Sequence, residues 1–197
     1  MNTPPPTLLA SQPFGALLEA VAAKTPAPGG GAVACAAGAL ACALAGMVVA
    51  YSLGKKDLAA HQPALEDAHA QLARARAVLL ALADEDAAAY GLLNELQRLP
   101  EGDARRAGLG AAAQACVQVP LAALATCAQV LDVCRGLAGR SNKFLASDLE
   151  IAVLLGRAAA QACGVNVRVN LPTLEGDAAQ NKAEGAASAL LARALAA

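Results

Sequence analysis

Residues 25–56 read TPAPGGGAVACAAGALACALAGMVVAYSLGKK, and this stretch decides the fold. No charged residue lies between Thr25 and Gly54. The prolines at its start forbid a helix there, and the glycines of residues 29–31 allow nearly any backbone angle. The alanine-rich part that follows predicts a helix over residues 32–53. Because this helix is apolar on all sides, we expect it in the middle of a helix bundle or in an interface between subunits.

The composition of the whole chain predicts the same fold class. The chain has 197 residues, enough for one domain with a substantial core. Hydrophobic residues make up 57% of it but aromatic residues only 2%, and alanine, the best helix former, dominates. We therefore predict an all-α protein, an antiparallel bundle of about five to seven helices with a long central helix.

Charge and cysteine content argue against several classes of function. The net charge is -1 and no basic tract is present, so we do not expect the chain to bind nucleic acid. The six cysteines lie inside apolar stretches and form no C-x-x-C pair, which predicts reduced, buried thiols and no metal site. With no signal peptide, the expected location is cytoplasmic.

Two uncharged stretches, residues 25–54 and 107–131, are long enough to span a bilayer. Their small and polar residues, and the lack of flanking Trp or Tyr belts, favour core helices of a soluble bundle instead. We therefore predict no membrane partner and keep a small integral membrane protein as an alternative.

Prolines, glycines and periodicity divide the rest of the chain. Residues 1–12 predict a flexible N-terminal tail, and residues 13–197 a single helical domain. Leucines at multiples of seven residues, from Leu58 to Leu93, indicate a long, coiled-coil-like helix. Pro120 should kink or divide the helix that contains it, and residues 164–172 should form a short extended or irregular link. The remaining helices are expected over residues 13–24, 57–99, 103–137, 143–163 and 176–197.

Polar features flank the apolar helix at both ends. Gly29, Gly30 and Gly31 precede it, where free backbone N–H groups and the helix dipole favour an anionic or carbonyl-bearing ligand. Lys55 and Lys56 follow it, where they either cap the helix in solvent or bind a carboxylate. A straight helix of this length puts its ends about 30 Å apart, so one compact headgroup cannot contact both in one subunit. Either an extended ligand bridges the ends, or the site joins two subunits.

An acidic triplet, Asp84-Glu85-Asp86, interrupts an otherwise apolar part of the long helix. Successive helical residues point about 100° apart, so the three carboxylates cannot share one site. Asp86 shares the seven-residue register of Leu79 and Leu93, which predicts a core position, whereas Asp84 lies on a face of small residues. A partly buried carboxylate with a raised pKa is often functional, and which aspartate plays that part stays open.

Further polar residues stand near other predicted helix ends. Asn142 and Asp148 lie at the start of one helix, where capping explains much of their presence. Asn166 and Asn170 either orient a ligand through their amides or fix an irregular backbone. The sequence suggests no Ser-His-Asp or Cys-His arrangement.

Taken in order, these motifs resemble those of one family. They are Thr-Pro-Ala-Pro-Gly-Gly-Gly from Thr25, Gly54-Lys55-Lys56, Asp84-Glu85-Asp86-Ala87, Val119-Pro120-Leu121, Ser147-Asp148, and Asn166-Val167 with Asn170. From Phe14 to Leu171 the chain is similar to the formiminotetrahydrofolate cyclodeaminase and methenyltetrahydrofolate cyclohydrolase family. The resemblance implies an all-helical subunit that dimerises through its helices, or forms a higher homo-oligomer, and binds a tetrahydrofolate.

The resemblance also implies roles for individual residues. The essential aspartate of the family matches Asp84, which would be the catalytic base, and Lys55 would polarise the developing oxygen or hold the pterin. The substrate-binding residues would be Pro28, Gly29, Gly30, Gly31, Lys56, Asn142, Asp148 and Asn166. No metal or redox cofactor is expected, because a tetrahydrofolate derivative is itself the substrate.

The activity that the resemblance implies is hydrolysis of 5,10-methenyltetrahydrofolate to 10-formyltetrahydrofolate. The first alternative is cyclodeamination of 5-formiminotetrahydrofolate with release of ammonia, which can use the same base. The absence of a fused formiminotransferase domain favours the cyclohydrolase expectation. The second alternative is a non-catalytic helical dimer that binds folate.

Overall fold

The structure, a computed structural model, describes Leu8 and residues 11–196. In this part of the chain every regular element is a helix, which confirms the all-α prediction. The elements are α1 (Phe14–Ala22), α2 (Gly30–Ala50), α3 (Gln62–Gln97), α4 (Leu109–Leu137), α5 (Ala146–Asn170) and α6 (Asp177–Leu195), with the 3₁₀ helices η2 (Lys56–His61), η3 (Ala104–Gly108), η4 (Lys143–Leu145) and η5 (Leu171–Thr173). Most of the predicted tail, residues 1–12, lies outside the described residues.

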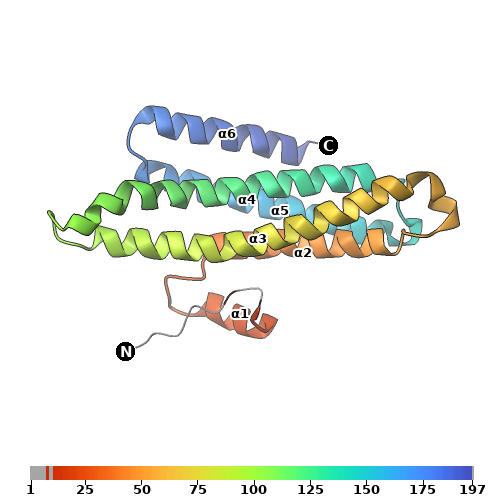
Figure 1. The fold of residues 1–197 in the computed structure, drawn as a ribbon, viewed down its shortest axis with the longest axis horizontal. Coiled ribbons are helices and arrows are strands. Elements are labelled where there is room, and N and C mark those ends of the chain that lie inside the picture. Colours follow the sequence, from red (N-terminus) through yellow and green to blue (C-terminus); the bar gives the residue numbers. More distant parts are fainter. Residues whose placement is uncertain (1–7, 9–10, 197) are drawn as a thin grey trace.

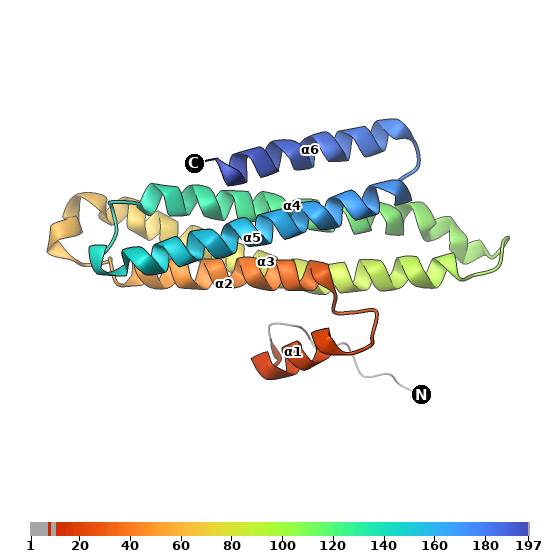
Figure 2. The ribbon, with the colours of Figure 1, turned by 180° about the vertical axis from the view of Figure 1, so that it is seen from behind.

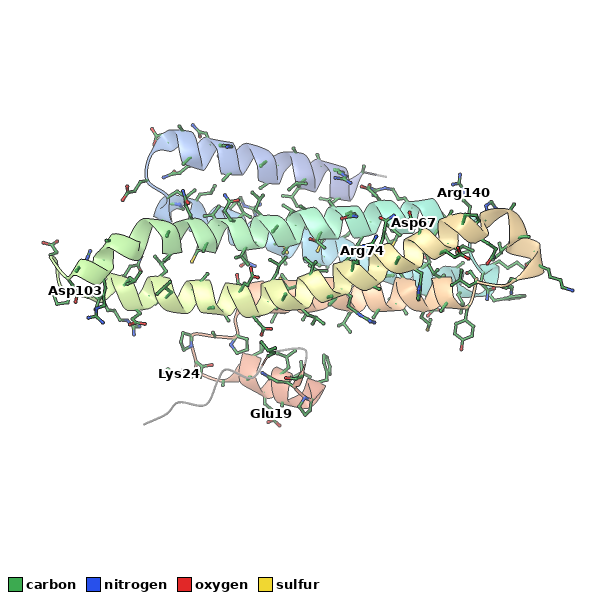
Figure 3. All side chains as sticks on the ribbon, viewed as in Figure 1. Glu19, Lys24, Asp67, Arg74, Asp103 and Arg140 are labelled. Atoms are coloured by element: carbon green, nitrogen blue, oxygen red, sulfur yellow. The ribbon has the colours of Figure 1, made fainter. Side chains whose placement is uncertain are left out.

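Helices α2 to α5 form an antiparallel four-helix bundle (Figure 1). α2 packs on α3 and α5, and α4 packs on the same two helices from the other side. α6 covers α4 and α5, whereas α1 lies beside the opposite side of the bundle, near α2 (Figure 2). Asp103 and Arg140 mark the two ends of the bundle, and Glu19 and Lys24 belong to the segment beside it (Figure 3). α2 begins near the middle of the long axis and ends toward Arg140 (Figures 1 and 3).

The core combines leucines from α3 with small residues from α2. The repeated leucines of α3 and η2 are all buried, which confirms that their register faces the core. A Cβ added at Gly38 of α2 would lie 3.0 Å from Sγ of Cys127, so a larger residue there would force its neighbours to shift. All six cysteines are free and buried, as the sequence predicts.

One helix is longer than the sequence predicts. α5 continues to Asn170, so the predicted extended link over residues 164–172 is wrong. Val167 is buried against the core, while Val165 and Val169 are exposed, and this is the burial pattern of a helix. An alternation of period two over so few residues does not distinguish the two structures. α4 contains Pro120 and is not divided there, so of the two predicted outcomes, a kink or a division, the division does not occur.

The apolar stretches noted in the sequence are core helices of this bundle. Residues 30–50 and 104–137 are long and apolar enough to cross a membrane by length and composition. In each, 56% of the most apolar window is nevertheless buried inside the bundle, and a core helix of a soluble protein passes the same test. The apolar composition of α2 and α4 is thus accounted for largely by packing.

Candidate active site

A cavity of about 240 Å³ opens where α2 begins. It lies between the first turn of α2, the second half of α3, the first half of α4 and the last turns of α5. The residues that line it are Pro26, Ala27, Gly29, Gly30, Gly31, Asp86, Ala87, Tyr90, Cys116, Asn166, Val169 and Asn170. Four segments that are distant in the sequence thus meet at one hollow.

The glycine loop approaches the α3 carboxylate very closely. α2 begins at Gly30, two residues earlier than predicted, so Gly30 and Gly31 form its first turn. A Cβ at Gly31 would overlap both carboxylate oxygens of Asp86, and one at Gly30 would lie 3.5 Å from Oδ1 of Asn166. Glycine is therefore needed at position 31 for the carboxylate to reach the start of the helix. The unpaired N–H groups of a first helical turn favour a negative charge there.

Asp86 has the environment of an acid–base group. Its side chain is half-buried, and burial raises the pKa of its carboxyl group above the usual value for aspartate. The cavity lining contains no Lys, Arg or His side chain that would lower the pKa again. A carboxylate of this kind is matched to proton transfer nearer neutral pH.

Two asparagines on one face of α5 supply amide groups at the cavity. Asn166 and Asn170 are one helical turn apart, so both reach the same hollow. Nδ2 of Asn170 donates a hydrogen bond to the carbonyl oxygen of Cys116 at 2.8 Å, which ties the end of α5 to α4. Burial, and then the charge of Asp86, raise the pKa of the Cys116 thiol, which disfavours its nucleophilic thiolate form.

A second polar cluster lies at the other end of α2. Nζ of Lys55 donates to Oδ1 of Asn142 at 3.4 Å and lies 5.7 Å from the centroid of the Phe144 ring. The fully buried Ser52 accepts a hydrogen bond from the backbone N–H of Asn142 at 2.8 Å and donates one to the carbonyl of Val48 at 2.7 Å. Ser52 therefore fixes the α4–α5 loop, and with it Asn142, beside the end of α2.

Six of the predicted site residues fall into two groups. Gly29, Gly30, Gly31 and Asn166 meet at the cavity, whereas Lys55 and Asn142 meet at the far end of α2.

The other predicted site residues lie outside the cavity lining. Asp84 is half-buried on α3, and Asp148 is half-buried in the first turn of α5. Lys56 is exposed at the start of η2, and Pro28 is half-buried in the loop before α2.

Sequence reasoning did not single out Tyr90, Cys116 or Ser52. Each is a single polar or weakly polar residue within an apolar helix or at its end, and no motif marks it. Asn170 was noted, but the predicted break in α5 concealed that it shares a face with Asn166. In the described part of the chain, no group of three or more His, Cys, Asp or Glu side chains is placed to hold a metal ion.

The all-helical bundle, with a half-buried carboxylate against a glycine turn, agrees with the folate enzymes that the sequence motifs predict. The chain belongs to the formiminotransferase-cyclodeaminase family, whose model matches residues 13–189. This confirms the family predicted from the sequence motifs.

The relatives and the solved structure that the chain resembles are named either as cyclohydrolases or as cyclodeaminases. The chain is 29% identical over 163 residues to methenyltetrahydrofolate cyclohydrolase from Methylorubrum extorquens, covering 80% of this chain and 78% of that protein. It is 31% identical to formimidoyltransferase-cyclodeaminase from Mus musculus over 87% of this chain but only 32% of that protein. The crystal structure of formiminotetrahydrofolate cyclodeaminase from Thermotoga maritima superposes with a TM-score of 0.82 at 29% identity, covering 94% of both chains. The chain therefore spans about a third of the formimidoyltransferase-cyclodeaminase and most of the other two proteins.

Proposed function

We propose that this protein hydrolyses 5,10-methenyltetrahydrofolate to 10-formyltetrahydrofolate, with Asp86 as the acid–base group. The observation that carries the proposal is the half-buried Asp86 carboxylate at the glycine turn, in a chain similar along most of its length to a methenyltetrahydrofolate cyclohydrolase. The substrate's amidinium carbon is cationic, and a cavity lined by one carboxylate and no basic side chain suits a cation.

The proposed reaction needs one base and a positioned water. Asp86 takes a proton from the water as its oxygen bonds to the amidinium carbon. When the resulting intermediate collapses, the bond from that carbon to N5 breaks, N5 takes the proton from Asp86, and the hydroxyl proton leaves to solvent. General acid–base catalysis of this kind contributes about 10²–10⁴-fold to a rate. Asn166 and the backbone N–H groups of the α2 start orient the substrate.

A second candidate function is cyclodeamination of 5-formiminotetrahydrofolate. The observation that favours it is the close structural similarity to a protein named as that cyclodeaminase. N10 of the substrate would attack the carbon of the protonated formimino group as Asp86 takes the N10 proton. Asp86 would then pass that proton to the formimino nitrogen, whose bond to the carbon breaks as ammonia leaves. The product is the same methenyl cation, so one cavity serves either reaction.

The proposal includes the setting in which the enzyme works. We expect a cytoplasmic homodimer or higher homo-oligomer that uses no cofactor apart from its folate substrate. Asp84 stays a candidate base, because the family motif points to it and it lies on the same helix as Asp86.

Two assays with paired variants test the function. Loss of methenyltetrahydrofolate absorbance above the spontaneous rate supports the cyclohydrolase, and ammonia release from formiminotetrahydrofolate supports the cyclodeaminase. Asp86→Asn should lower the activity by about 10²–10⁴-fold, and Asp84→Asn is the matched comparison on the same helix. Full activity of Asp86→Asn would mean that another residue is the acid–base group. Folate binding without turnover would favour a non-catalytic binding protein.

A further inference from the structure

The cavity at the start of α2 is lined on two levels, one helical turn apart. α3 and α5 run in the same direction through the bundle (Figure 1). Asp86 and Tyr90 are four residues apart on α3, and Asn166 and Asn170 are four residues apart on α5, so each pair advances about 6 Å along its helix. The first turn of α2 lies against Asp86 and Asn166, which form the first level. Tyr90 and Asn170 form the second level, beyond the start of α2.

The amide group of Asn170 is held in one orientation by α4. Its Nδ2 donates a hydrogen bond to the carbonyl oxygen of Cys116 at 2.8 Å. Because an amide group has a donor on one side and an acceptor on the other, this bond leaves Oδ1 to face away from α4. In the part of the chain that the structure describes, Oδ1 accepts no hydrogen bond, and it is accessible rather than buried. The second level of the cavity therefore offers a hydrogen-bond acceptor of fixed orientation that is available to a ligand.

The substrate of the proposed reaction carries its groups in a matching order. Its amidinium carbon and the 2-amino group of its pterin ring lie at opposite ends of the fused ring system. With the amidinium carbon beside Asp86 at the first level, the ring extends along α3 and α5 and brings the 2-amino donor to the second level. Tyr90, which is 45% exposed, lines the cavity at this level and provides an aromatic face on which the ring can pack.

From this geometry we infer that Asn170 selects the pterin ring, with its Oδ1 accepting a hydrogen bond from the 2-amino group. The inference rests on the proposed function and deepens it, because it assigns the end of the substrate that the proposed chemistry does not use. Asn170 is thus a specificity residue that lies away from the reacting atoms. A site built to bind a ligand N–H discriminates against an analogue that lacks it, because the acceptor of the site is then left unpaired.

Two ligands that differ only at position 2 of the pterin ring test this assignment. One is 5-formyltetrahydrofolate, which is the substrate of neither proposed reaction, and the other is its analogue with a methyl group in place of the 2-amino group. Calorimetry should show that the wild type binds the methyl analogue about tenfold more weakly. Asn170→Leu, which keeps the size of the side chain without its polar atoms, should bind both ligands equally. Equal binding of the two ligands by the wild type would overturn the inference however the variants fold.

Asn94→Leu is the matched control. Nδ2 of Asn94 also donates to a backbone carbonyl, that of Tyr90 at 3.0 Å, but Asn94 does not line the cavity. This variant should keep the preference of the wild type for the 2-amino ligand. If Asn170→Leu weakens the binding of both ligands by the same factor, Asn170 only ties α5 to α4 and the inference is wrong.

Turnover of the two folate substrates is measured separately from this binding. A preference for the 2-amino ligand that depends on Asn170, without turnover of either substrate, would refute the proposed function and support the inference. An active enzyme whose preference is the same in Asn170→Leu and in the wild type would refute the inference alone.

Discussion

The contact between Gly31 and Asp86 is the most demanding local feature of the site. Position 31 has no room for a Cβ because both carboxylate oxygens occupy the space. The sequence indicated a glycine turn and a core aspartate separately. Their contact could not be predicted, because it depends on how α2 and α3 align across the bundle. Asp84, the aspartate matched to the family motif, does not line the cavity, and its catalytic role stays a prediction.

Gly31→Ala should greatly reduce activity. The added methyl group forces either the Asp86 carboxylate or the start of α2 to move, and a displacement of about 1 Å at a catalytic group can cost about 10²-fold in rate. The measurement is kcat/KM with the preferred folate. Gly46→Ala on the same helix is the control, because nothing lies within 4 Å of its added Cβ, and it should keep full activity with equal or higher stability. Equal activity of the two variants would contradict the proposed role of the glycine turn.

Asp86→Asn should lower kcat/KM by about 10²–10⁴-fold. In the wild type, kcat/KM should rise with pH through the raised pKa of Asp86, because the base must be ionised to accept the proton.

The contribution of Asp86 to the free energy of unfolding should fall over the same pH range. A carboxyl group whose pKa is raised by folding stabilises the protein fully below its unfolded pKa, and this contribution is lost as pH rises through the folded pKa. Asp86→Asn should therefore be the more stable protein at pH 7, with a difference that shrinks in acid, as measured by urea unfolding.

At the scale of the helices, the periodicity of the sequence predicts which helices form and which face of each is buried. It predicts the residues at which the helices end less well. The seven-residue leucine repeat of α3 identified the buried face, and Asp86 within that repeat is half-buried where its register predicts a core position. The end of α5 was missed because a short alternation of valine and polar residues fits a strand or a helix. Burial against α4, which decides between the two, is a tertiary effect that the sequence does not display.

Ser52→Ala should destabilise the end of α2. The Ser52 hydroxyl is fully buried and accepts the backbone N–H of Asn142, so the substitution leaves a partly buried donor without its partner. A loss of this kind costs about 1–3 kcal/mol. Urea unfolding measures the change, with the exposed Ser188→Ala on α6 as a control expected within about 0.5 kcal/mol of the wild type. A Ser52→Ala protein as stable as that control would show that the loop is held by other contacts.

At the scale of the whole molecule, the bundle explains why the sequence predicts the site residues but not how they are distributed. Family motifs at both ends of α2 were recognised, yet the fold separates them along its length. A single chain therefore presents a carboxylate cavity in one place and a lysine–aromatic cluster in another. α1 lies beside the bundle near α2, and the exposed Phe14 and Leu18 add apolar surface to that region (Figures 1 and 2).

Leu40→Lys should separate the subunits and remove activity together. Leu40 is 49% exposed at the middle of α2, a helix without charged residues. In a homodimer that pairs along this helix, the introduced lysine would lie in a desolvated contact, where a charge without a partner is costly. In one subunit the side chain is half exposed, so the helical fold should be retained, as circular dichroism would show. Light scattering should report a monomer, and kcat/KM should fall although Leu40 does not line the Asp86 cavity. Ser188→Lys on α6 adds the same charge on the other side of the bundle and should leave both properties unchanged. A Leu40→Lys monomer with full activity would mean that each subunit holds a complete site, with the Lys55 cluster serving another purpose.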